Sequence, residues 1–156
     1  MQEKHSFAWL ACLVLTAGID TAAARGIGQE HPYAAEHIDN LPADVRRAVL
    51  AHERACGGKA AATHYFSTSI ATPTLSLLSL HFENFSCPNR GVLCSAAGCL
   101  HEIYAGRGMN YRRVFSVQAE DVRLTKAGDA VGLEVRRGGA TQLYRWNGSG
   151  FVAMRP

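Results

Sequence analysis

Residues 122–146, VRLTKAGDAVGLEVRRGGATQLYRW, decide the fold class of this chain. Apolar and polar residues alternate within three short runs, which is the period of a β-strand with one buried face. The runs occupy residues 122–125, 131–136 and 142–146. Gly128-Asp129 and Gly138-Gly139 separate them, and such pairs favour two-residue hairpin turns. Turns this short predict antiparallel pairing of consecutive strands.

The β-type pattern continues on both sides of this stretch. Further runs lie at residues 99–105, 111–117 and 151–154, and Asn147-Gly148 supplies another turn. Upstream, apolar residues alternate with polar ones from Leu78 to Glu83, which predicts a half-buried strand. The phase slips at Asn84-Phe85, as it does at a β-bulge.

One amphipathic helix is expected before the strands. Asp39-Asn40-Leu41-Pro42 combines capping side chains with a proline suited to the first helical turn, and Gly57-Gly58 supplies the stop. Val45, Val49, His52 and Cys56 recur on one face. We therefore expect an α+β fold, an antiparallel β-meander of about six to seven strands with one N-terminal helix packed on it, formed by a single domain over residues 39–156.

The first 24 residues have the order of a signal peptide. Lys4 precedes a short apolar run, and small residues follow it, so cleavage is expected after Ala24, with Ala22 or Ala23 as alternatives. The apolar run is too short to span a membrane. Cys12 does not have the context of a lipidation site, because apolar residues follow it. We expect a periplasmic or secreted protein in which residues 25–38 are a flexible linker.

The charge pattern argues against nucleic acid as a partner. The formal net charge is only +3, and the basic residues form no continuous run. The pairs Arg112-Arg113 and Arg136-Arg137 are expected to lie on the surface, where they would contribute to solubility or to weak anion contacts and not to folding.

Four cysteines follow the signal peptide: Cys56, Cys87, Cys94 and Cys99. An even number in an exported chain predicts two disulfides. The short distance that a disulfide can span favours Cys94–Cys99, which are joined by a flexible loop, and this leaves Cys56–Cys87 between the helix and the sheet. The rival pairing, Cys87–Cys99 with Cys56–Cys94, stays open because spacing does not fix connectivity.

No linear motif identifies a reaction. The spacing between Cys94 and Cys99 is not that of a redox C-x-x-C pair, and neither a G-x-S-x-G turn nor a phosphate-binding glycine loop is present. His81, Glu83, His101 and Glu102 could form a metal site on paired strands, although such residues more often line a solvated sheet face. From the sequence we assign no catalytic, cofactor-binding or metal-binding residue.

The helix and the strands resemble a group of small exported proteobacterial proteins of unknown function. The similarity lies in residues 54–58 (RACGG), Cys87, residues 93–99 (LCSAAGC), residues 111–114 (YRRV) and the closing residues 143–148 (LYRWNG) with Phe151-Val152. The resemblance implies a periplasmic location and no particular activity. Members often carry an Asp-rich calcium loop, but residues 67–75 contain no acidic residue here, so calcium binding is not implied.

Two classes of function follow from these features. The first is a binding or inhibitor-type module that engages an envelope protein or a glycan, as small disulfide-bonded β domains commonly do. The second is a periplasmic hydrolase whose site is not visible in linear motifs. The sequence favours the first class, and it indicates neither the ligand nor the oligomeric state.

Overall fold

The structure is a computed structural model that describes residues 32–107 and 110–155. The helices are α1 (Glu36–Asp39) and α2 (Ala43–Ala55), and the short 3-10 turns are η1 (His64–Phe66), η2 (Phe82–Asn84) and η3 (Arg90–Val92). The strands are β1 (Ala61–Ala62), β2 (Ser67–Ala71), β3 (Ser76–His81), β4 (Phe85–Ser86), β5 (Cys94–Ser95), β6 (Gly98–Arg107), β7 (Asn110–Ala119), β8 (Asp121–Ala127), β9 (Ala130–Arg137), β10 (Ala140–Trp146) and β11 (Phe151–Ala153).

The strands form three antiparallel sheets. The first sheet has the order β2-β3-β6-β5, with β7 also paired to β6, the second has the order β11-β10-β9-β8, and β1 pairs with β4. The prediction of an antiparallel β fold with one main helix is confirmed. The prediction of a meander of six to seven strands was wrong in number and in continuity, because the chain changes sheet at Glu120, the single residue between β7 and β8. The predicted meander is present from β8 to β11.

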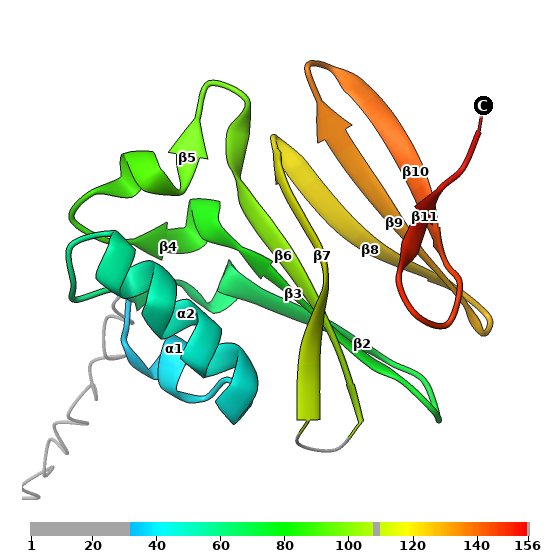
Figure 1. Ribbon diagram of the computed structural model, residues 1–156, viewed down its shortest axis with the longest axis horizontal. Helices are drawn as coiled ribbons and strands as arrows, with labels where there is room; N and C mark the ends of the chain where they lie inside the picture. The colour runs from blue at the N-terminus through cyan, green and yellow to red at the C-terminus, as the bar shows by residue number, and fades with distance from the viewer. Residues whose placement is uncertain (1–31, 108–109, 156) are drawn as a thin grey trace, which may run out of the picture. The chain divides into compact units, whose positions relative to one another are not determined.

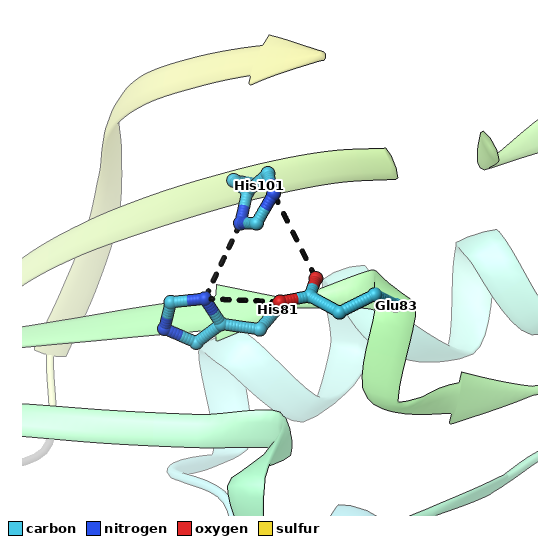
Figure 2. Close-up of side chains that lie close together, drawn as sticks. All are labelled: His81, Glu83 and His101. Atoms are coloured by element: carbon cyan, nitrogen blue, oxygen red, sulfur yellow. Dashed lines mark hydrogen bonds and ion pairs between the residues drawn. The ribbon is translucent and has the colours of Figure 1, made fainter. Parts of the chain in front are cut away.

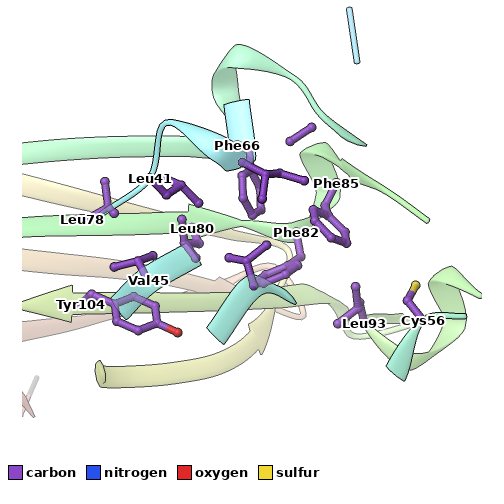
Figure 3. Close-up of a cluster of buried hydrophobic side chains, with 13 residues drawn as sticks. Leu41, Val45, Cys56, Phe66, Leu78, Leu80, Phe82, Phe85, Leu93 and Tyr104 are labelled. Carbon is purple, nitrogen blue, oxygen red and sulfur yellow. The ribbon is translucent and has the colours of Figure 1, made fainter. Parts of the chain in front are cut away.

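The first sheet is covered on both faces. Figure 1 shows α2 on one side of it and strands β8–β11 on the other. On the helix side, Val45 and Val49 of α2 belong to the same buried cluster as Leu80 and Phe82, and Figure 3 shows the aromatic rings gathered there. On the other side, Ile103 of β6 packs with side chains of β8 and β9. Strands β3 and β6 are therefore central strands with two buried faces.

The folded domain starts earlier than residue 39. Residues 1–31, which include the predicted signal peptide and the first part of the expected linker, lie outside the described residues. From residue 32 onward the expected linker is structured: Ala34 exchanges backbone hydrogen bonds of 2.9 and 3.1 Å with Ala62, and Ile38 of α1 is buried in the core. A single short turn of helix carries too few apolar residues to show periodicity, so the sequence pattern missed it.

Two disulfides join the elements. Cys56, directly after α2, is bonded to Cys87, which we call the helix–sheet bridge, with a Cα–Cα distance of 5.9 Å. Cys94 of β5 is bonded to Cys99 of β6, which we call the hairpin bridge, with a Cα–Cα distance of 3.9 Å. This is the pairing that the sequence favours; the alternative pairing of Cys87 with Cys99 is not formed. Within residues 32–107 and 110–155, no helix has both the length and the apolar character needed to cross a membrane.

Candidate functional site

Strands β3 and β6 place two histidines inside the protein. His81 ends β3 and His101 lies opposite it on β6, in a directly paired register. The side chain of His101 is 0% exposed and that of His81 is 10% exposed. The expectation of a solvated sheet face was wrong here, because the β8–β11 sheet covers the face that carries these residues.

Glu83 completes a cluster with the two histidines. It belongs to the turn η2, which directly follows β3 and brings the carboxylate back toward the strands (Figure 2). The Nδ1 atoms of His81 and His101 are 3.2 Å apart, and Nδ1 of His81 is 3.7 Å from Oε1 of Glu83. One nitrogen or oxygen ligand atom from each residue lies within 4.8 Å of the others.

The remaining ring nitrogens are held by neighbours outside the cluster. Nε2 of His101 is 3.2 Å from the backbone oxygen of Ala119, and Nε2 of His81 is 3.1 Å from Oγ1 of Thr68. Both oxygens can accept a hydrogen bond, so both imidazoles can carry their proton on Nε2. That tautomer leaves the two Nδ1 lone pairs facing each other and free to bind a cation.

Gly98 allows the Ala119 carbonyl to come this close. Its φ is +108°, and a Cβ atom there would lie 1.9 Å from the oxygen of Ala119. Only glycine fits a backbone approach of this kind in the left-handed region. The glycine thus fixes the corner between β7 and β8 that orients the ring of His101.

The electrostatic surroundings favour neutral imidazoles. Burial lowers the pKa of His81, an effect that the nearby charge of Glu83 opposes, and burial likewise lowers the pKa of His101. Burial raises the pKa of Glu83, although a backbone hydrogen bond and the charge of His81 act in the other direction. Metals bind the neutral form of histidine.

One carboxylate atom of the cluster has no hydrogen-bond partner. Oε2 of Glu83 is buried and unpaired among the described residues, and its nearest ring nitrogen, Nε2 of His101, is 3.7 Å away. A buried unpaired carboxylate oxygen is unfavourable unless a donor or a cation compensates it. The cluster therefore has the chemistry to hold a cation.

Glu102 is not part of this cluster. Successive residues of a strand point to opposite faces, so Glu102 faces the helix while His101 faces the second sheet. Its carboxylate, 1% exposed, accepts a hydrogen bond of 2.6 Å from the hydroxyl of Tyr104 and lies 3.3 Å from Nε2 of His52 on α2. The four residues singled out from the sequence are thus divided between two sites, with three in one and Glu102 in the other.

The carboxylate of Glu102 also binds Arg113 of β7. Burial alone would raise the pKa of Glu102, but hydrogen bonds from His52 and Tyr104 and the charges of His52 and Arg113 together hold it below its usual value. Arg113 was expected to be a solvated charge with no part in folding. The structure corrects this, because its half-exposed guanidinium compensates a buried carboxylate.

A serine-protease-like triad is not assembled at His81. The residue types would suit one, with Thr68 as nucleophile, His81 as base and Glu83 as carboxylate. Oγ1 of Thr68 is within hydrogen-bond distance of the His81 imidazole. In a triad, however, Nδ1 donates to the carboxylate. Here the closest partner of Nδ1 of His81 is the ring of His101 at 3.2 Å, and the Glu83 carboxylate is 3.7 Å away.

A cavity lies at the opposite end of the two large sheets. Leu75, Arg107, Trp146 and Gly148 are shared by two adjoining hollows with volumes of about 410 and 440 Å³. Tyr111 and Arg112 line the first hollow, and the second is lined in addition by residues of the β8–β9 turn and the start of β9. Loops at the end of a β-sandwich commonly form binding sites.

The walls of this cavity combine apolar and cationic groups with the carboxylate of Asp129, which lines the second hollow. Leu75 and Trp146 supply apolar surface. Nε of Arg107 donates to the backbone oxygen of Thr74 at 2.8 Å, and a terminal nitrogen of Arg112 donates to the backbone oxygen of Ser149 at 2.9 Å. Each guanidinium keeps further donors for a ligand. No sequence motif indicates this site, because its lining comes from four separate segments of the chain.

Comparison with family models, with curated proteins and with solved structures finds no match for this chain.

Proposed function

We propose that this chain is an exported binding module of the cell envelope, and that its ligand is a small acidic glycan held in the cavity between the two large sheets. The observation that carries the proposal is that Trp146, Arg107 and Arg112 line the same hollow. An aromatic ring offers a flat apolar surface for a sugar ring, and arginine is well suited to binding carboxylates.

The size and position of the cavity support this proposal. Hollows of about 410 and 440 Å³ lie within the range of small-ligand pockets, roughly 300–1,000 Å³. The lining comes from both large sheets, so the paired strands hold the two sides of the cavity in place. The resemblance to small exported proteobacterial proteins supports a periplasmic location.

Trp146 offers a direct test. The chain has two tryptophans, and the other, Trp9, lies in the predicted signal peptide. In the exported protein, tryptophan fluorescence would therefore report on the cavity alone. We expect oligosaccharides of galacturonic acid to change this fluorescence in a saturable way, and oligosaccharides of galactose, which lack the carboxylate, to bind at least about tenfold more weakly.

Arginine variants connect the signal to the cavity. Arg107→Gln and Arg112→Gln should each weaken the binding of the acidic oligosaccharide several-fold, whereas Arg145→Gln, an exposed arginine of β10 outside the lining, should not. Equal binding of the acidic and neutral sugars, or no binding of either, would contradict the proposal. Turnover of a substrate in a broad hydrolase screen, lost in these same variants, would favour the alternative of a periplasmic hydrolase.

A further inference from the structure

The cluster of His81, Glu83 and His101 lies at the other end of the sheets from the cavity and has no part in the proposed glycan site. From its geometry we propose that these three residues bind one divalent transition-metal ion, with zinc as the expected occupant. The ligand atoms are Nδ1 of both histidines and the carboxylate of Glu83.

The separation of the two Nδ1 atoms fits a bound metal. In a tetrahedral zinc site with zinc–nitrogen bonds of about 2.0–2.1 Å, the two nitrogens are about 3.3 Å apart. His81 and His101 have their Nδ1 atoms 3.2 Å apart, although they lie on different strands. Oε1 of Glu83 is 3.7 Å from Nδ1 of His81, and one ligand atom of each of the three residues lies within 4.8 Å of the others.

The outer partners of the imidazoles support a metal site as well. In metal sites, a histidine ligand almost always donates its other ring proton to an oxygen, which fixes the ring. The oxygens of Ala119 and Thr68 are in place to accept these protons. Both rings are therefore already oriented toward a common point between them.

A hydrogen-bonded cluster without an ion explains less of the geometry. A chain of hydrogen bonds from Thr68 through His81 and His101 to Ala119 would satisfy the ring nitrogens. It would leave Oε2 of Glu83 buried without a partner. A divalent ion beside this carboxylate compensates its charge, and the buried imidazoles contribute neutral nitrogen ligands.

The ligand set determines the class of metal. Two imidazoles with one carboxylate suit zinc and its first-row neighbours, whereas calcium and magnesium prefer oxygen ligands alone. Among the described residues, the cluster supplies three ligands. The histidines are nearly closed off from solvent while 37% of the Glu83 side chain is exposed, so the fourth coordination position faces the Glu83 side, where water can occupy it.

The test uses the exported protein with its disulfides intact, without a histidine tag and after treatment with a chelator. Titration calorimetry with zinc chloride should give one site per chain, and cobalt(II) should give the strong visible absorption of a four-coordinate ion. Calcium and magnesium chloride should give no binding. Because His101 is fully buried and its replacement could unfold the protein, Glu83→Gln is the principal variant, and it should weaken zinc binding at least tenfold.

Two further variants serve as controls. Glu36→Gln changes an exposed glutamate of α1 and should leave zinc affinity unchanged. Thr68→Val removes the outer partner of His81 while the ligands stay in place, and it should weaken zinc binding measurably with the fold intact, as shown by an unchanged circular dichroism spectrum. Absence of zinc binding by the wild-type protein, or equal affinity in wild type and Glu83→Gln, would overturn the proposal. Neither result bears on the glycan cavity, which is tested by Trp146.

Discussion

Replacing Arg113 by alanine should destabilise the domain although the side chain is half exposed. Its partner Glu102 is 1% exposed, and it would remain buried with two hydrogen-bond partners instead of three. A hydrogen bond to a charged group contributes about 1.5–3 kcal/mol, and breaking a fully buried ion pair costs about 3–5 kcal/mol. Because Arg113 is 51% exposed, we expect the lower end of the first range, about 2 kcal/mol.

A double-mutant cycle separates this charge effect from lost packing. Glu102→Gln keeps the size of the side chain and removes its charge, so Arg113→Ala should cost less than about 0.5 kcal/mol in that background, and the coupling energy should be about 1.5 kcal/mol. Arg136→Ala is the matched control, since its pair with Glu120 is exposed on both sides and should contribute less than about 0.5 kcal/mol. Urea unfolding of the four proteins of the cycle and of the control gives these free energies. If Arg113→Ala loses no more stability than Arg136→Ala, the proposed role of the buried carboxylate is refuted.

Two further predictions concern the backbone and the disulfides. Gly98→Ala should lower the free energy of unfolding by about 2–4 kcal/mol, because the added Cβ would overlap the carbonyl of Ala119. Gly128→Ala is the control: its φ is +60° and its Cβ would have nothing within 4 Å, so it should cost only about 1 kcal/mol. Similar losses for the two variants in urea unfolding would contradict the close approach at Gly98. Removal of the helix–sheet bridge, whose cysteines are 31 residues apart, should cost about 3.7 kcal/mol, and removal of the hairpin bridge, whose cysteines are 5 residues apart, about 2 kcal/mol. The double serine variant of the helix–sheet bridge should therefore have the lower melting temperature. A lower melting temperature for the double serine variant of the hairpin bridge would contradict this order.

The local features of the fold were readable from the sequence. Gly128-Asp129 and Gly138-Gly139 occupy the turns between β8, β9 and β10 as predicted, because hairpin turns depend on a few adjacent residues. Helix α2 also ends before Gly57, and Val45 and Val49 of its predicted apolar face are buried. Short-range chemistry determines these elements, so a pattern over a few residues is sufficient to locate them.

The candidate sites depended on contacts that no local pattern contains. The alternation from Leu78 to Glu83 indicated one buried face, but the second sheet covers the other face and buries Ser79 and His81. The residue pattern of a strand covered in this way is the same as that of a half-exposed one until the covering sheet is known. For the same reason the sequence could suggest His81, Glu83 and His101 as metal ligands without separating Glu102 from them.

Arg113 shows the same limit for charged residues. It belongs to a pair of arginines next to an expected turn, a context typical of the surface. Only the register of β6 and β7, in which a bulge falls between Ile103 and Tyr104, brings its side chain to Glu102. A change of register by one residue would point the arginine to the other face.

Both proposals concern the exported form of the protein, in which the four cysteines are paired in two disulfides. The intact mass of the protein purified from its native host, measured without reductant, tests this most directly. The mass should equal that of residues 25–156 less the four hydrogens lost in forming the two disulfides. A mass that still includes residues 1–24, or a protein with four free thiols, would contradict the account of an exported, disulfide-bonded domain.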